Sequence, residues 1–145
     1  MPELGREQST TLPSDPLRLR SARRWLSRAV LESGFAPQDA HELGVAFSEA
    51  CANLHRHAYG GRRDGRVELR VTFEGDRVVV VLDHDGRPFA PAEYASPDLR
   101  RPSENGYGLF LINALVDDVS FEDTGSGGRV VLVKRKSRVH LQMSR

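Results

Sequence analysis

The sequence predicts an α+β fold in which a layer of helices covers one face of a sheet. Three observations predict it: a helical apolar period up to about residue 58, a period of two from residue 66, and a second apolar helix followed by two short strands. The expected order is helix, helix, strand, strand, loop, helix, strand, strand. The predicted architecture is a two-layer sandwich with a mixed, mostly antiparallel sheet.

Length and composition exclude several classes of protein. A chain of 145 residues fits one domain, and a net charge of +1 from 21 basic and 20 acidic residues gives no general attraction for nucleic acid or an anionic membrane. The single cysteine, Cys51, cannot form an intrachain disulfide and is expected to be a small buried apolar residue. No apolar run is long enough to span a membrane and the N-terminus has no hydrophobic signal segment, which predicts a cytoplasmic protein.

The first helix is predicted to begin at a capping signal. Ser14-Asp15-Pro16 places a capping side chain before a first-turn proline, and Gly34 ends the helix. Residues 1–13, with little to bury, are expected to be a flexible lead-in to a domain spanning 14–136. The second helix is expected to run from Pro37 to about Ala58.

Four strands are expected beyond that helix. Residues 67–73 alternate apolar and polar side chains, residues 74–76 make the turn, and residues 78–82 form an apolar run typical of a central strand covered on both sides. Residues 119–122 and 129–134 form the last pair, joined through a glycine-rich turn. The polar tail, 137–145, is expected to fray.

The second helix carries an unusual polar combination. Glu49, Asn53 and His57 are four residues apart, which aligns them on one face. One interpretation is an ordinary solvated side of an amphipathic helix. The other makes Asn53 a Mg²⁺ ligand through its amide oxygen and Glu49 a base or water-orienting group.

Two glycine-containing stretches lie where a ligand could approach the backbone. Residues 83–89, including Gly86, follow the central strand. A proline-rich loop over residues 90–105 is long for so small a domain, which is typical of a lid. Gly106-Tyr107-Gly108 then leads into the apolar helix from Leu109, where free N–H groups could receive phosphate oxygens.

Taken together and in this order, these stretches resemble the ATP-binding domain of gyrases, sensor histidine kinases and bacterial anti-sigma-factor serine kinases, the last most closely. The similarity covers residues 12–136. It implies the Bergerat (histidine-kinase-like ATPase) fold, ATP and Mg²⁺ as cofactors, Glu49 as catalytic base and Asn53 as the metal ligand. The further nucleotide-binding positions that the resemblance implies are His57, His84, Gly86, Gly106, Tyr107, Gly108 and Leu109. Arg100 and Arg101 are lid candidates for the γ-phosphate.

Three positions depart from the family pattern. His84 stands where an aspartate usually accepts a hydrogen bond from the adenine amine, and neighbouring Asp83 and Asp85 point to other faces. Leu54 replaces a small residue, which adds volume to the core or to the pocket. Asn105 stands where another glycine is common.

The resemblance implies an anti-sigma factor that sequesters a sigma factor and phosphorylates a serine of a STAS-type antagonist protein with Mg-ATP, as a homodimeric transferase in transcription regulation. The alternative is a partner-switching binding module of the same fold that binds nucleotide weakly or not at all. His84 motivates the alternative. Neither hypothesis involves direct nucleic-acid or membrane binding.

Overall fold

The computed structural model describes residues 6–89 and 104–137, and the side chains of Glu104, Asn105, Gly106 and Tyr107 lie outside that description. Five strands form one sheet in the order β1-β2-β3-β5-β4, and every neighbouring pair is antiparallel. The strands are β1 (Arg6–Pro13), β2 (Arg66–Glu74), β3 (Arg77–His84), β4 (Asp118–Asp123) and β5 (Gly128–Arg135). The α+β prediction is confirmed, but the expectation of a mixed sheet is wrong, because every described strand pairing is antiparallel.

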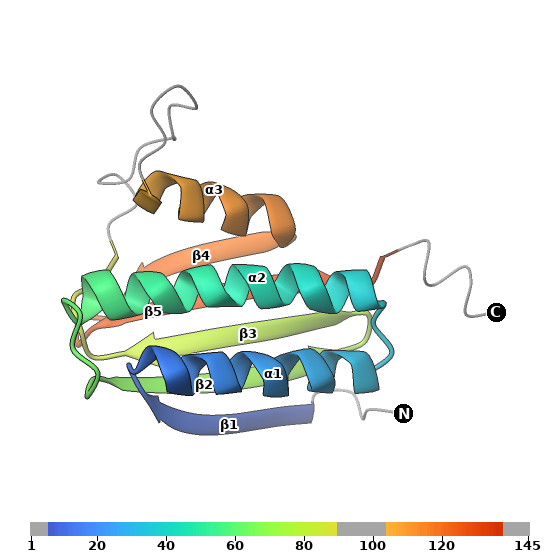
Figure 1. Cartoon of the computed structure of the whole chain (residues 1–145). Helices are drawn as coiled ribbons and strands as arrows, with labels where there is room; N and C mark the ends of the chain where they lie inside the picture. Colours follow the sequence, from blue (N-terminus) through green and yellow to red (C-terminus); the bar gives the residue numbers. More distant parts are fainter. Residues whose placement is uncertain (1–5, 90–103, 138–145) are drawn as a thin grey trace.

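The helices cover one face of this sheet. They are α1 (Pro16–Glu32), α2 (Pro37–Asn53), the π-helical turn η1 (Leu54–Ala58) and α3 (Glu104–Leu115). Figure 1 shows α1 and α2 side by side across the sheet, with α3 alongside α2 near β4. No helix in the described ranges is long and apolar enough to cross a membrane.

The core lies between the two layers. Alternate residues of β2 and β3 point towards the helices and are almost fully buried, as the period of two predicts. From α2, Leu43 and Phe47 reach the same core, and Ile112 joins it from α3. The intervening valines of β3, Val79 and Val81, are only half-buried. The prediction that this strand is central is therefore confirmed, but the expectation that both its faces are covered is wrong.

The predicted flexible lead-in is wrong for residues 6–13. These residues form β1, which pairs with β2 from Arg6 opposite Phe73 to Pro13 opposite Arg66. The segment buries few side chains, so its apolar pattern is weak, and its stability comes from the backbone ladder along the sheet edge. At the other end, the Ser137 N–H donates to the Asp39 carboxylate at 3.0 Å, and the rest of the expected tail lies outside the described residues.

The start of α1 confirms the predicted capping signal. Asp15 is the N-cap, its carboxylate accepts from the Leu17 N–H at 3.0 Å, and Pro16 opens the first turn. Ser14 has another role: its buried hydroxyl donates to the Arg62 carbonyl at 2.6 Å and accepts from the Gly65 N–H at 2.9 Å. The helix start is thereby anchored to the loop that enters β2.

Candidate functional site

The polar side chains of α2 line two separate spaces, an open cleft and a small cavity. Glu49 lines an open cleft between α1, α2 and α3, whereas Asn53 and His57 line a small cavity between α2 and the sheet. Four residues advance a helix by 400°, so successive members of the series are offset by about 40°. Asn53 and His57 line the same cavity, whereas Glu49 lines the neighbouring cleft, so the three side chains predicted to share one face border two separate spaces.

The small cavity holds two polar atoms that have no partner. Its volume is about 20 Å³, enough for about one water molecule. Asn53 and His84 both line it, and Asn53 Oδ1 and His84 Nδ1 are buried without a hydrogen-bond partner among the described residues. An amide oxygen left in this way suits a ligand that supplies a cation or a donor, so Asn53 fits the predicted Mg²⁺.

His84 occupies the sheet side of this cavity, as its position in β3 dictates. The ring is 8% exposed, and its desolvation lowers the pKa of His84 below the usual 6.5, although the carboxylates of Asp85 and Asp83 oppose that shift. The imidazole is therefore neutral at neutral pH. Gly128 makes room for it, because a Cβ there would stand 2.6 Å from His84 Nε2.

The two neighbouring aspartates are engaged elsewhere, as predicted. Asp83 lies on the opposite face of the sheet, where its carboxylate accepts from Arg129 at 2.6 Å and Arg70 at 3.0 Å. Asp85 lies 2.8 Å from the Tyr59 hydroxyl, and burial together with that carboxylate raises the pKa of Tyr59 to about 12. Neither carboxylate lines the small cavity.

Gly86 is fixed by close backbone packing. A Cβ at this position would lie 2.5 Å from the carbonyl oxygen of Ala58, the same oxygen that accepts from the Arg87 N–H at 2.9 Å. The first glycine stretch thus holds the exit of β3 against the end of η1. Leu54 and Ala58 form part of the cavity wall there, so the extra volume of Leu54 serves both the core and the pocket.

Aromatic rings close the cavity on its outer side. Phe89 and Phe121 pack with centroids 4.4 Å apart, and both line the cavity together with Val130. The apolar pattern of the sequence does not single out either phenylalanine, because the pair forms only when the β3 exit meets β4.

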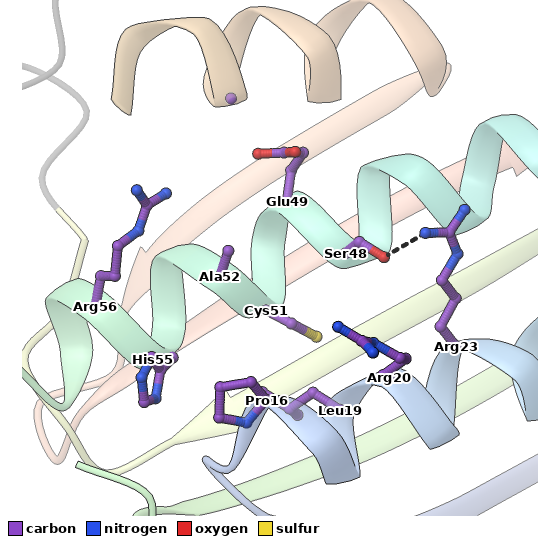
Figure 2. A pocket seen from close by; sticks show the side chains of 11 residues that line it. Pro16, Leu19, Arg20, Arg23, Ser48, Glu49, Cys51, Ala52, His55 and Arg56 are labelled. Atoms are coloured by element: carbon purple, nitrogen blue, oxygen red, sulfur yellow. Dashed lines mark hydrogen bonds between the residues drawn. The ribbon is translucent and has the colours of Figure 1, made fainter. Parts of the chain in front are cut away.

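The open cleft is larger and basic. It has a volume of about 560 Å³. In Figure 2, Arg20 and Arg23 reach into it from α1, and Arg56 and Glu49 from the opposite side; Arg23 donates to the Ser48 hydroxyl at 3.0 Å. Apart from the basic side of the first helix, no pattern in the sequence indicates this cleft, since its walls come from three separate helices.

Glu49 meets the second glycine stretch in this cleft. A Cβ at Gly108 would stand only 2.8 Å from Glu49 Oε2, so the glycine leaves room for the carboxylate in its present position where α3 passes it. The helix begins at Glu104, earlier than predicted, and its packing against α2 outweighs the low helix propensity of glycine. Gly106 is the third helical residue, and its N–H is among those without a helical acceptor, whereas Tyr107, Gly108 and Leu109 lie beyond these free N–H groups.

Of the other predicted positions, the lid candidates Arg100 and Arg101 lie outside the described residues, as does the side chain of Asn105. The predicted roles of Glu49, Asn53, His57, His84, Gly86 and the 106–109 stretch stay predictions.

Residues 12–134 match the family model of the histidine kinase-like ATPase domain. The chain belongs to the histidine kinase-like ATPase family. Among its curated relatives in this family, the serine-protein kinase RsbW of Bacillus velezensis is 30% identical over 135 residues, which are 85% of this chain and 81% of the relative. The serine-protein kinase RsbW of Bacillus subtilis is 29% identical with the same coverage.

Two solved structures share this histidine kinase-like ATPase fold. The RsbU and RsbW domains of Rv1364c from Mycobacterium tuberculosis superpose with a TM-score of 0.68 at 21% identity, over 92% of this chain and 33% of that one. The histidine kinase domain of the blue-light activated histidine kinase from Erythrobacter litoralis EL346 gives a TM-score of 0.57 at 18% identity, over 91% of this chain and 65% of that one. The chain therefore spans a third of the first structure and about two thirds of the second.

Proposed function

We propose that this chain is an ATP-dependent serine-protein kinase that acts as an anti-sigma factor. The observation that carries the proposal is the meeting of Glu49 with Gly108 at the start of α3, one helical turn from Asn53 with its unpartnered amide oxygen. These groups are a carboxylate able to take a proton, helix N–H groups able to hold phosphate, and an oxygen able to bind a metal ion. Family membership and the RsbW relatives support the same activity.

Each residue then has a defined task. Asn53 would bind Mg²⁺ through Oδ1 and so position the nucleotide phosphates beside α2. The bound ion supplies charge neutralisation for the phosphates. The free N–H groups in the first turn of α3 would donate hydrogen bonds to phosphate oxygens, helped by the positive end of the helix dipole. Glu49 would orient the serine hydroxyl and accept its proton, since phosphoryl transfer depends mainly on positioning and charge neutralisation.

The basic cleft gives the acceptor protein a place to dock. It opens directly onto Glu49, so an acceptor serine must enter through it or at its rim. Arg20 and Arg23 would attract an acidic segment that carries this serine. The proposed acceptor is a STAS-type antagonist protein, and the second partner is a sigma factor held away from RNA polymerase. A homodimeric, cytoplasmic protein with a role in transcription regulation belongs to the same proposal.

A second candidate function rests on the small cavity. At about 20 Å³ it is too small for a purine as it stands, and His84 replaces the expected carboxylate. A binding module that exchanges partners without nucleotide would need neither a larger cavity nor an acceptor for the adenine amine.

Phosphate transfer to a cognate antagonist separates these functions. The purified chain should transfer the γ-phosphate of Mg-ATP to the antagonist, and Glu49→Gln should reduce the rate by about 10²-fold or more, since it removes the base but keeps the shape. Arg20→Ala combined with Arg23→Ala should raise KM for the antagonist and leave ATP affinity unchanged. Transfer that is absent in the native chain, together with sigma binding that ignores ATP, would favour the binding module.

A further inference from the structure

We propose that His84 reads the nucleobase and that it makes the site accept adenine and guanine nucleotides alike. This inference rests on the proposed nucleotide-dependent function and adds a specificity to it. It concerns a residue at which this chain departs from the pattern of the family it resembles.

The position of His84 is that of a base-reading group. The side chain is more than nine-tenths buried, it lines the cavity beside Asn53, and its Nδ1 is fully buried without a partner. Gly128 makes room for the ring, because a Cβ there would lie 2.6 Å from His84 Nε2, and Gly127 lets the β5 entry pass close to the backbone of His84. The backbone of the β5 entry is thus shaped to fit this imidazole.

No neighbour fixes which ring nitrogen carries the proton. Within residues 6–89 and 104–137, no hydrogen bond involves either nitrogen of His84, and its ring contact is an edge-on packing against Tyr59 with centroids 6.0 Å apart. A neutral imidazole has one donor and one acceptor, and the partner of one nitrogen normally decides the role of the other. Without such a partner, Nδ1 can either accept or donate.

The ability of Nδ1 to accept or donate matters because adenine and guanine differ in the group that would hydrogen-bond to it. Adenine presents an amine, which donates, and guanine presents a carbonyl oxygen, which accepts. An aspartate can only accept, so it pairs with adenine and opposes guanine. Nδ1 of His84 can accept from the first and donate to the second. The negative charges closest in sequence, Asp83 and Asp85, are held by arginines and by Tyr59, respectively, and do not line the cavity.

The remaining walls offer little else to distinguish the bases. Six of the ten lining residues are apolar: Ala50, Leu54, Ala58, Phe89, Phe121 and Val130. Of the polar ones, His57 and Arg87 have other interactions, and Asn53 is the proposed metal ligand. Both purines are larger than the cavity, so opening of the Phe89–Phe121 side is required equally for either.

The test is calorimetric binding of ATP and GTP, each with Mg²⁺ at pH 7.5, to the native chain and to two variants. The native chain should bind the two nucleotides with dissociation constants within about threefold of each other, because one hydrogen bond of similar strength serves each base. His84→Asp should prefer ATP by at least about tenfold, since guanine would leave a buried carbonyl facing a carboxylate. His84→Asn, whose amide offers both a donor and an acceptor, should stay within about threefold.

The outcomes separate this inference from the proposed function. The contrary result is a native chain that binds ATP more than about tenfold tighter than GTP, with the same ratio of dissociation constants as His84→Asp. In that case the inference is wrong and the kinase proposal stands. If it binds neither nucleotide, both are wrong. If His84→Asp does not fold, the native ratio and the His84→Asn variant still decide the matter.

Discussion

The contact between Gly108 and Glu49 yields a prediction in which stability and activity change in opposite directions. In Gly108→Ala the new methyl group would stand 2.8 Å from Glu49 Oε2, closer than real Cβ contacts. The atom it meets is the end of a flexible side chain and not backbone. The carboxylate should therefore swing away while α2 and α3 keep their positions.

The two consequences have different sizes. Alanine is favoured over glycine inside a helix by about 1 kcal/mol, so the folded state should gain up to that amount and Tm should rise by roughly 2–4 °C. A catalytic group displaced by about 1 Å can cost about 10²-fold in rate. We expect the rate of phosphate transfer to fall by roughly 10- to 100-fold.

The rate is measured by single-turnover transfer of the γ-phosphate to a cognate antagonist, and the stability by thermal unfolding. Asn113→Ala is the matched control, because Asn113 lies on the exposed side of the same helix and, within the part of the chain that the structure describes, its amide donates to the Leu109 carbonyl alone, at 3.0 Å. It should gain a little stability with no change in rate. A Gly108→Ala protein that is stable and transfers phosphate at the native rate would refute the role given to Glu49.

Three further changes test other parts of the structure. Gly86→Ala should lose about 1–3 kcal/mol of stability, because its Cβ would stand 2.5 Å from the backbone oxygen of Ala58; urea unfolding measures this loss. Lys134→Met removes the 2.9 Å ion pair with Glu42 and should cost about 2 kcal/mol at pH 7. Burial is the largest single influence and would raise the pKa of Glu42, but the hydrogen bonds from Lys134 and Gln38 and the charges of Lys134 and His41 together outweigh it and hold that pKa below 4.5. The difference between native and variant should therefore be full above that pH and shrink as acid protonates Glu42. Phe89→Ala should bind Mg-ATP roughly 2- to 10-fold tighter by calorimetry, since no aromatic pair has to separate to admit the base.

Each of these three predictions has an outcome that would contradict it. A Gly86→Ala protein as stable as the native chain would mean that the β3 exit is not tightly packed. A native-minus-variant difference for Lys134→Met that stays constant down to pH 3 would show that the ion pair does not stabilise the fold. Weaker nucleotide binding by Phe89→Ala would mean that this ring contacts the base instead of blocking it.

Local patterns predicted most of the fold because the features they describe are local. The cap at Asp15, the alternation in β2 and the turn after it depend on a few neighbouring residues. The strand at Arg6–Pro13 could not be predicted in this way, because it is held by backbone pairing with residues some sixty positions away. The early start of α3 has a similar origin, since its packing on α2 overrides the preference of its glycines.

The candidate site was predictable residue by residue but not as an arrangement. Spacing singled out Glu49 and Asn53 as candidates, yet it could not show that one lines the open cleft and the other the small cavity. The offset of about 40° between residues four apart separates them only because other elements pack against the helix. The phenylalanine pair and the arginine-lined cleft were missed, since each is assembled from elements distant in sequence. His84 was identified as a departure, and the structure adds that, among residues 6–89 and 104–137, no hydrogen-bond partner determines its tautomer.

The central claim is that Asn53 and the start of α3 form a magnesium-dependent nucleotide site. Its most direct test is a calorimetric titration of ATP into the native chain with and without Mg²⁺, repeated with Asn53→Ala and with the exposed control Asn113→Ala. ATP binding should strengthen with Mg²⁺ in the native chain and in the control, and this strengthening should be lost in Asn53→Ala. ATP binding that is indifferent to Mg²⁺ in all three proteins, or no binding in any of them, would contradict it.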